Sequence, residues 1–328
     1  MMESSAEAAR GGAGPEVGGA NAPAAAVRTL PALEAKDARR SVSSVLSDYI
    51  ALTKPRIISL LLVTTVAAMF VADPAGPALS TVLWTVLGGY LAAGGAGAIN
   101  HYLERESDAR MARTRGRPLA SGRIAPLHGL AFGIALGTAA VVELAVAVNV
   151  LTAALALGGL LGYAFVYTLW LKPLTPQNIV IGGAAGAVPP LVGWAAATGG
   201  LDLGAVALFA VVFMWTPPHF WALALLIKDD YARTGVPMLP VVYGEAATRR
   251  QILAYAVALV ATTLLPAAGG LFGAPYVVAA LVLGAAFVGL AARLKVRPSR
   301  RAALHLYLAS LAYLALLFCA MAIDRVVW

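Results

Sequence analysis

The sequence predicts an all-α integral membrane protein, a bundle of about nine transmembrane helices. Three observations support this prediction. Apolar residues make up 60% of the chain and charged residues only 12%, with a mean hydropathy of +0.80, whereas soluble domains carry about 25% charged residues. The apolar residues gather in continuous runs of membrane-spanning length, and Lys and Arg fall on alternate connections between these runs.

The chain opens on a segment, residues 1–46, that is rich in Ala, Gly, Ser, Pro and charge and has no apolar period. Such a composition favours disorder. The segment also lacks the apolar run and the small-residue cleavage pattern of a secretory signal peptide. We therefore expect two parts, a disordered cytoplasmic tail over 1–46 and a transmembrane domain over 47–328.

Nine apolar runs follow, each close to the roughly 17–25 residues that a helix needs to cross a bilayer. Membrane β-strands would alternate in polarity over about ten residues, so continuous runs favour helices. Pro126 and His128 place the start of the third run near the membrane interface. The expected spans are 57–72, 79–100, 125–145, 149–169, 178–198, 204–226, 251–272, 275–293 and 302–323.

The basic residues predict the orientation of these spans. Of the 24 Lys and Arg residues, all except Arg325 fall in the N-terminal tail or in connections on the same side. The opposite connections, 73–78, 146–148, 199–203 and 273–274, contain none. Positive loops stay inside, so we expect a multi-pass protein of the cell membrane with its N-terminus and basic loops in the cytoplasm. Topology accounts for the net charge of +8, and no nucleic-acid partner is expected.

The two longest connections, 101–124 and 227–250, follow the second and sixth spans, which run in the same direction. Each begins with acids and continues through an Arg-Thr pair, Gly and Pro. This pattern indicates a weak parallel repeat, in which one site forms between two similar halves. The single cysteine, Cys319, excludes a disulfide or a cysteine-based metal site within one chain.

The first connection carries a candidate metal site. Asn100, Glu104 and Asp108 are four residues apart, so on a helix they form one oxygen-rich stripe, whereas Glu106 points away. Magnesium prefers hard oxygen ligands and takes one or two carboxylates together with substrate phosphates. The arginines that follow have the geometry to hold phosphate oxygens. The alternative is that these arginines only anchor the loop at the membrane surface; they are Arg110, Arg113, Arg117 and Arg123.

The second connection carries a second acidic cluster. Two prolines, Pro217 and Pro218, are expected to interrupt the sixth span next to His219. The residues Lys228, Asp229, Asp230 and Tyr231 follow. At equal depth on helices of the same direction, the two acidic clusters could face a common cavity. The alternative is that Lys228 pairs with Asp229 or Asp230 at the membrane surface.

These two blocks, NHYLERESDARMARTRGRPLASGRI and PPHFWALALLIKDDYARTGVPMLPVVYG, together with Thr53-Lys54-Pro55-Arg56, resemble the UbiA-type intramembrane prenyltransferases, in particular their haem-farnesylating branch. The resemblance covers roughly residues 47–323. Two departures stand out. Glu104 occupies a position where Asp is commoner, and the second block lacks acids four residues from Asp230, where Leu226 and Thr234 stand.

The resemblance implies transfer of the farnesyl group of farnesyl diphosphate to a vinyl group of haem b, giving haem O and diphosphate, with magnesium assisting ionisation of the donor. Membrane lipid surrounds the protein, and a downstream haem-modifying membrane enzyme is a further possible partner. The implied metal ligands are Asn100, Glu104, Asp108 and Asp230, which with Lys228 form the catalytic set. The implied substrate-binding residues are Lys54, Arg56, Arg113, Arg117, Arg123, Lys172, His219, Asp229 and Tyr231.

Apolar walls would shield the allylic cation from water, and the candidate residues are Trp170, Trp194, Trp215, Phe220 and Trp221. Arg293, Lys295 or Arg297 is the expected contact for the haem propionates. Two alternatives remain open from the sequence. One is a related prenyltransferase with a quinone-precursor or chlorin acceptor, and the other is a transporter of an anionic lipid or solute, which would release no diphosphate.

Overall fold

The computed structural model describes residues 41–327, and within this range all regular structure is helical. The compact unit that contains the helices begins at Val42. Its elements are α1 (Val42–Thr53), α2 (Pro55–Ala72), α3 (Leu79–Arg110), α4 (Pro126–Ala147), α5 (Val150–Leu161), the π-helix η1 (Gly162–Leu171), α6 (Lys172–Leu174), α7 (Asn178–Gly186), α8 (Val188–Thr198), α9 (Leu203–Leu226), α10 (Lys228–Arg233), α11 (Leu239–Val242), α12 (Gly244–Ala268), α13 (Ala274–Val296) and α14 (Arg300–Val327).

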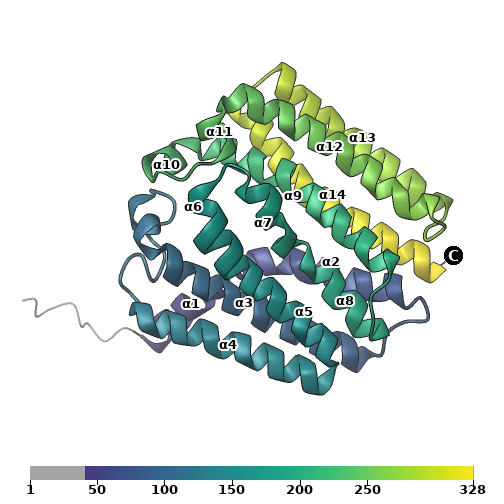
Figure 1. Cartoon of the computed structure of the whole chain (residues 1–328), viewed down its shortest axis with the longest axis horizontal. Coiled ribbons are helices and arrows are strands. Elements are labelled where there is room, and N and C mark those ends of the chain that lie inside the picture. The colour runs from purple at the N-terminus through teal and green to yellow at the C-terminus, as the bar shows by residue number, and fades with distance from the viewer. Residues whose placement is uncertain (1–40, 328) are drawn as a thin grey trace, which may run out of the picture. The chain divides into compact units, whose positions relative to one another are not determined.

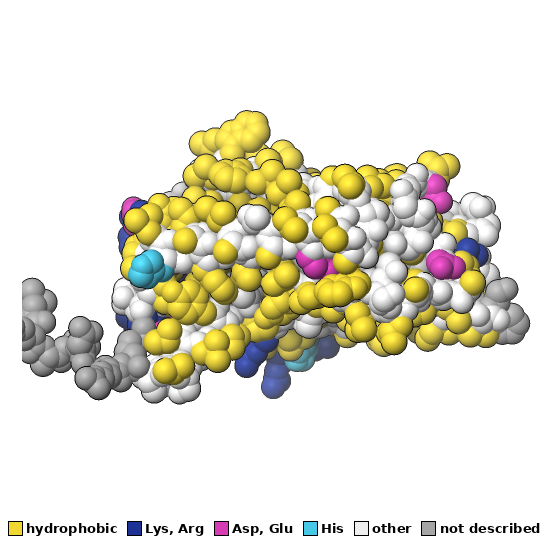
Figure 2. All heavy atoms as spheres, turned by 90° about the horizontal axis from the view of Figure 1, so that it is seen from below, with side chains coloured by type: hydrophobic (Ala, Val, Ile, Leu, Met, Phe, Trp, Pro, Cys, Tyr) yellow, Lys and Arg dark blue, Asp and Glu magenta, His cyan; other side chains and the backbone are white. Residues whose placement is uncertain are grey.

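Nine helical segments in the described range are long and apolar enough to cross a membrane, which confirms the predicted multi-pass helical protein. Large apolar side chains such as Leu203 (86% exposed) and Val146 (84% exposed) point outward. Figure 2 shows a face on which hydrophobic side chains predominate, with Lys and Arg at its edges. The outer surface therefore has the chemistry of a lipid-facing surface.

The helices lie side by side in two groups, which are connected through α2, α8 and α9 (Figure 1). The segments α3, α4 and α5 form one group, and α12, α13 and α14 form the other. The loop after α3 and the short helices α10 and α11 lie together at one end of the bundle. The second span is longer than its expected end at residue 100, because α3 continues to Arg110. One continuous helix therefore carries Asn100, Glu104 and Asp108.

The first helix corrects the expected boundary of the tail. Residues 42–46, expected to be disordered, belong to α1; Ser41 precedes the helix, and residues 1–40 of the expected tail lie outside the described residues. The helix is held by its buried Leu52 and by Asp48, which forms an ion pair with Arg123 at 3.0 Å. This short apolar segment is helical here and packs against α3.

A break at Lys54 separates α1 from α2. Lys54 has φ 58° and ψ 54°, and it is the only non-glycine residue with positive φ within residues 41–327. Pro55 follows, and a proline disfavours the right-handed helical conformation of the residue before it. A lysine in the left-handed region is uncommon, and here the turn directs its side chain toward α3.

Close backbone contacts join α8 to α2 and α3 to α4. A Cβ added at Gly193 of α8 would lie 2.1 Å from the Thr65 carbonyl oxygen of α2, and one at Gly95 of α3 would lie 2.8 Å from the Gly133 oxygen of α4. Only glycine allows this approach of the backbones, as is common for packed membrane helices.

The expected interruption of the sixth span is wrong, since α9 continues through Pro217 and Pro218 as one helix from Leu203 to Leu226. Prolines are tolerated in a membrane helix where surrounding groups satisfy the backbone. The preceding turn is fixed by Trp215, whose indole N–H donates to the Ser310 carbonyl oxygen of α14 at 2.8 Å. Both prolines are buried.

Candidate functional site

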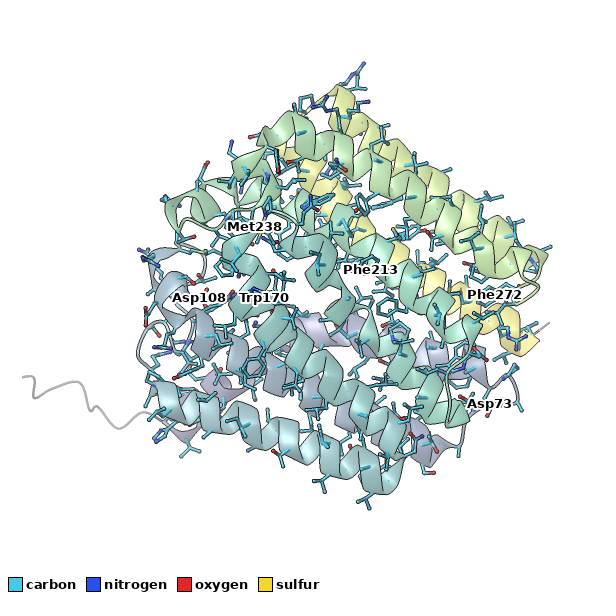
Figure 3. The ribbon with its side chains drawn as sticks, in the orientation of Figure 1. Asp73, Asp108, Trp170, Phe213, Met238 and Phe272 are labelled. Atoms are coloured by element: carbon cyan, nitrogen blue, oxygen red, sulfur yellow. The ribbon has the colours of Figure 1, made fainter. Side chains whose placement is uncertain are left out.

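A cavity of about 250 Å³ lies where α3 emerges from the bundle. Figure 3 shows Asp108 at the same end of the molecule as Met238, whereas Asp73 and Phe272 lie at the opposite end. The cavity is lined by Lys54, Ile57, Asn100, Glu104, Asp108, Met111, Arg113, Arg117, Tyr163, Tyr167, Lys172, Ile179, Gly182, Gly183, Gly186, Thr216, Phe220, Leu223 and Tyr231.

The stripe on α3 forms one wall of this cavity, as its four-residue spacing predicts. Each of the three stripe residues contacts a basic side chain from a different segment. Asn100 Oδ1 accepts a hydrogen bond from Lys54 Nζ at 2.5 Å. Lys54 is the residue between α1 and α2, and its left-handed backbone conformation directs its ammonium group into the cavity.

The second stripe residue, Glu104, forms an ion pair with Lys172 of α6. Both side chains are mostly buried, with 12% and 15% exposed. Lys172 directly follows η1, the π-helix that continues α5. The end of this helix therefore brings a second basic residue, besides Lys54, to the cavity.

The third stripe residue, Asp108, accepts a hydrogen bond from Arg117 Nη1 at 2.6 Å, and its side chain is only 4% exposed. Thr114 donates to the Asp108 carbonyl oxygen at 3.0 Å, which holds the loop against the end of α3. Arg113 also lines the cavity. The loop after α3 therefore folds back and places Arg117 against the stripe and Arg113 in the cavity wall.

The second acidic cluster is placed differently from the prediction. Lys228 pairs with Glu245 at 2.8 Å rather than with Asp229 or Asp230, and this hydrogen bond raises the pKa of the Lys228 ammonium. Asp230 pairs with Arg233 on its own helix, and Asp229 is exposed. Of the four residues at 228–231, the cavity is lined by Tyr231 alone. A six-residue helix, α10, turns the acids aside and the tyrosine inward.

Three further predicted substrate-binding residues lie outside the cavity lining. Arg56 is exposed, and Arg123 pairs with Asp48. His219 faces α14, where its Nδ1 lies 2.6 Å from the Ser310 hydroxyl oxygen and its ring stacks between Trp215 and Tyr307. The face of α9 that does reach the cavity carries Thr216, Phe220 and Leu223.

The expected aromatic walls are mostly elsewhere. Phe220 lines the cavity, whereas Trp194, Trp215 and Trp221 are buried in the protein core and Trp170 is 62% exposed on the outside. The three residues expected near the haem propionates, Arg293, Lys295 and Arg297, are exposed at the end of α13 and do not line the cavity.

Tyrosines take the place of the expected tryptophans. Tyr163 and Tyr167 of η1 stack at 5.6 Å between ring centroids and line the cavity with Tyr231. Burial raises the pKa of Tyr231 to about 12, so its hydroxyl keeps its proton at neutral pH. Tyr163 and Tyr167 were missed from the sequence. The only signal was two tyrosines four residues apart in a span that ends on a lysine.

An apolar cavity of about 240 Å³ adjoins the polar one. It lies between α2, α3, α5 and α8, with Leu61, Ala93 and Val192 among its walls. The two cavities share four lining residues, which are Lys54, Ile57, Tyr163 and Gly186. A ligand with a polar head and an apolar chain could therefore occupy both cavities across this junction.

Burial gives Lys54 an unusual acid–base behaviour. Loss of solvent, followed by the charge of Arg117, lowers the pKa of its ammonium to about 7, although Glu104 acts in the opposite direction. A nearby anion favours the charged form of such a group. Lys54 therefore responds strongly to the charge of whatever enters the cavity.

Magnesium is the metal that the stripe suits. Within residues 41–327, no three His, Cys, Asp or Glu side chains form a metal-binding group. However, the stripe offers an amide oxygen and two carboxylates on one helix face, and magnesium commonly takes one or two protein carboxylates and obtains its remaining ligands from phosphates and water. The donor set fits a magnesium ion that arrives with a diphosphate.

Comparison with known proteins assigns the family. Residues 61–322 match the model of the UbiA prenyltransferase family, and the chain belongs to that family. It is 54% identical over 285 residues to a protein of Roseiflexus sp. (strain RS-1) named protoheme IX farnesyltransferase, covering 87% of this chain and 53% of the relative. It is 51% identical over 278 residues to a protein of the same name from Alkalilimnicola ehrlichii, covering 85% and 92%. The chain thus spans about half the length of the first curated relatives it matches.

Solved structures share the fold. A structure described as digeranylgeranylglyceryl phosphate synthase has a TM-score of 0.71 and 18% identity, covering 86% of this chain and 99% of that one. A UbiA homologue from Archaeoglobus fulgidus, bound to DMAPP and Mg²⁺, has a TM-score of 0.56 and 14% identity, covering 84% and 99%. At these identities the similarity establishes the helical architecture.

Proposed function

We propose that this member of the UbiA family transfers the farnesyl group of farnesyl diphosphate to a vinyl carbon of haem b and so produces haem O. The observation that carries the proposal is the junction of the two cavities at Lys54, Ile57, Tyr163 and Gly186. It suits an allylic diphosphate whose head lies among charged residues and whose chain lies among apolar ones. The names of the relatives that match this chain support the choice of farnesyl and haem.

The donor would bind with its diphosphate between the stripe and the basic side chains. Lys54, Arg113, Arg117 and Lys172 all line this cavity and could hold phosphate oxygens by charge-assisted hydrogen bonds. A magnesium ion held by Asn100, Glu104 and Asp108 would neutralise the negative charge that grows on the leaving diphosphate. Asp230, which pairs with Arg233, would join this set only after its side chain turned.

The reaction breaks the bond between C1 of the farnesyl chain and the diphosphate oxygen, and the electron pair leaves with the diphosphate. The vinyl carbon of haem b then forms a new bond to C1, and the cation left on the former vinyl group takes up water and releases a proton. The charge of Lys54 at the junction would stabilise the leaving oxygen. The neighbouring rings of Tyr163 and Tyr167 present aromatic faces that attract a cation.

The acceptor would approach from the apolar side of the polar cavity. Ile179, Phe220 and Leu223 form this wall and suit the flat apolar face of a porphyrin. The two propionates would point toward the basic end of the bundle, where Arg113 lines the cavity. Since positive loops remain inside, this end would face the cytoplasm of the cell membrane. The haem O formed there would be available to a further haem-modifying membrane enzyme.

The test is to incubate membranes containing the protein with haem b, farnesyl diphosphate and magnesium, and to identify haem O by mass. Product that requires the protein and disappears with a chelator supports the proposal. Farnesylation of a quinone precursor or chlorin instead of haem would support the proposed donor site but show that the proposed acceptor is wrong. If no acceptor is modified and no diphosphate is released, the proposed chemistry is wrong and transport of an anionic solute becomes the better hypothesis.

A further inference from the structure

The π-helix η1 sets the orientation of a cavity residue on another helix. It runs for 10 residues from Gly162 to Leu171, and its i→i+5 hydrogen bonding is rare and often found at functional sites. In this register Tyr163 and Tyr167 both line the cavity. Thr168, one residue further, is only 6% exposed and reaches α3.

The Thr168 hydroxyl makes two hydrogen bonds, and the chemistry of its partners decides which of them it donates and which it accepts. Its hydroxyl lies 2.8 Å from the carbonyl oxygen of Tyr163. A carbonyl oxygen can only accept, so the single hydroxyl proton of Thr168 is committed to it. The hydroxyl oxygen is left with acceptor capacity alone, and the side-chain amide of Asn100 donates to it through Nδ2 at 3.1 Å.

This direction decides which end of the Asn100 amide faces the cavity. With Nδ2 turned toward Thr168, Oδ1 is on the opposite side, where Lys54 Nζ donates to it at 2.5 Å. If the amide were reversed, its NH₂ group would face the Lys54 ammonium and the Thr168 oxygen would lose its donor. Asparagine is the one member of the stripe for which the orientation matters, since both ends of a carboxylate are oxygens.

We infer that Thr168 is a positioning residue that keeps the oxygen of Asn100, rather than its nitrogen, turned toward the metal and diphosphate. The inference rests on the proposed function, because the oxygen is needed there as a ligand. Removing groups that orient metal ligands commonly reduces metal affinity about 10- to 100-fold. The effect should depend on the residue at position 100 being an amide.

The test measures Mn²⁺ binding by electron paramagnetic resonance in purified protein with inorganic diphosphate, without haem or prenyl donor. Mn²⁺ suits hard oxygen ligands as magnesium does. Thr168→Val should weaken Mn²⁺ binding about tenfold or more, whereas Thr168→Ser, which keeps the hydroxyl, should restore it. The matched control is Thr64→Val, since Thr64 is 2% exposed and its hydroxyl bonds only to the Leu61 carbonyl oxygen; it should leave Mn²⁺ binding unchanged.

A second comparison separates orientation from a general packing defect. In an Asn100→Asp background, adding Thr168→Val should change Mn²⁺ binding by less than about twofold, because a carboxylate presents an oxygen in either orientation. Unchanged binding in Thr168→Val alone, or an equal loss in both backgrounds, would overturn the inference and leave the proposed function intact. A wild-type protein that binds no Mn²⁺ with diphosphate would overturn both. The unfolding temperature of each variant confirms that the compared proteins are folded.

Discussion

The ammonium of Lys54 lies 2.5 Å from the amide oxygen of Asn100, and so joins the break between α1 and α2 to the polar stripe of α3. The contact depends on the left-handed backbone conformation of Lys54, which residues other than glycine rarely adopt. Backbone strain of this kind persists where the surrounding structure fixes it, often at functional sites. The position of Lys54 also gives the site its clearest pH dependence.

Diphosphate binding should weaken as pH rises through neutrality. Burial lowers the pKa of Lys54 to about 7, so the side chain is charged below this pH and neutral above it. An anion binds the charged form more tightly, and the affinity should fall by up to about tenfold per pH unit above 7. Calorimetric titration of inorganic diphosphate in the presence of a chelator measures this. Lys54→Arg, which stays charged, is the control and should reduce the slope to that of the ligand's own ionisation.

Loss of the Asp108 charge should abolish most of the activity without unfolding the protein. Asp108→Asn keeps the size of the side chain but removes a charge that faces the cavity, and we expect a decrease in haem O formation of about 10²–10³-fold. Glu106→Gln is the matched control on the same helix, because Glu106 is 80% exposed and pairs with Arg105 at the surface. Equal activity of the two variants at equal protein levels would contradict the role of the stripe.

Removing one partner of the ion pair between Glu104 and Lys172 should destabilise the protein more than removing both partners. Each side chain is at most 15% exposed. A single change, Lys172→Met, leaves a buried charge without its partner and should destabilise the protein by about 3–5 kcal/mol. The double variant Lys172→Met with Glu104→Gln should recover much of this loss. Unfolding of the purified protein in denaturant measures both. Additive losses would show that the pair is not coupled.

Filling the apolar cavity should shorten the prenyl chain that the protein accepts. Ala93 lines this cavity, and Ala93→Leu would displace part of a C15 chain. With about 0.8 kcal/mol per buried CH₂, the loss of two methylenes raises the KM for farnesyl diphosphate about tenfold, and that for geranyl diphosphate less. Ala139→Leu, on the exposed side of α4, is the control. If both donors lose equally, the chain lies elsewhere.

The sequence predicts those features that depend on local periodicity. The nine spans follow from runs of apolar residues, and the stripe follows from the spacing of Asn100, Glu104 and Asp108 on a helix. The partners of the stripe could not be predicted in this way. Lys54 and Lys172 are far from it in the chain, and the first reaches it through a left-handed turn and the second through a π-helix.

For the second connection, residues 227–250, the predicted placement of the acidic side chains was wrong. Its acids were expected in the cavity because they are charged and lie at the right depth. In the structure, α10 turns Asp230 toward Arg233 and Tyr231 toward the cavity. A six-residue helix is too short for a periodic pattern to show which face is buried, and its orientation is decided by tertiary packing.

The pairing of all three stripe residues with basic side chains also affects how phospholipid headgroups would compete with the prenyl donor for the cavity. Phospholipid headgroups carry phosphates and vastly outnumber any prenyl donor. A pocket with unengaged cations at the membrane surface would be blocked by these headgroups. Of the four basic residues that line the cavity, Lys54, Arg117 and Lys172 are each already engaged by an oxygen of α3, whereas Arg113 is exposed. A singly charged phosphate cannot compensate for the separation of three such contacts, whereas a diphosphate that brings its own divalent cation offers a new partner to both sides. If the donor binds as proposed, this pairing would favour a metal-bound diphosphate over lipid headgroups.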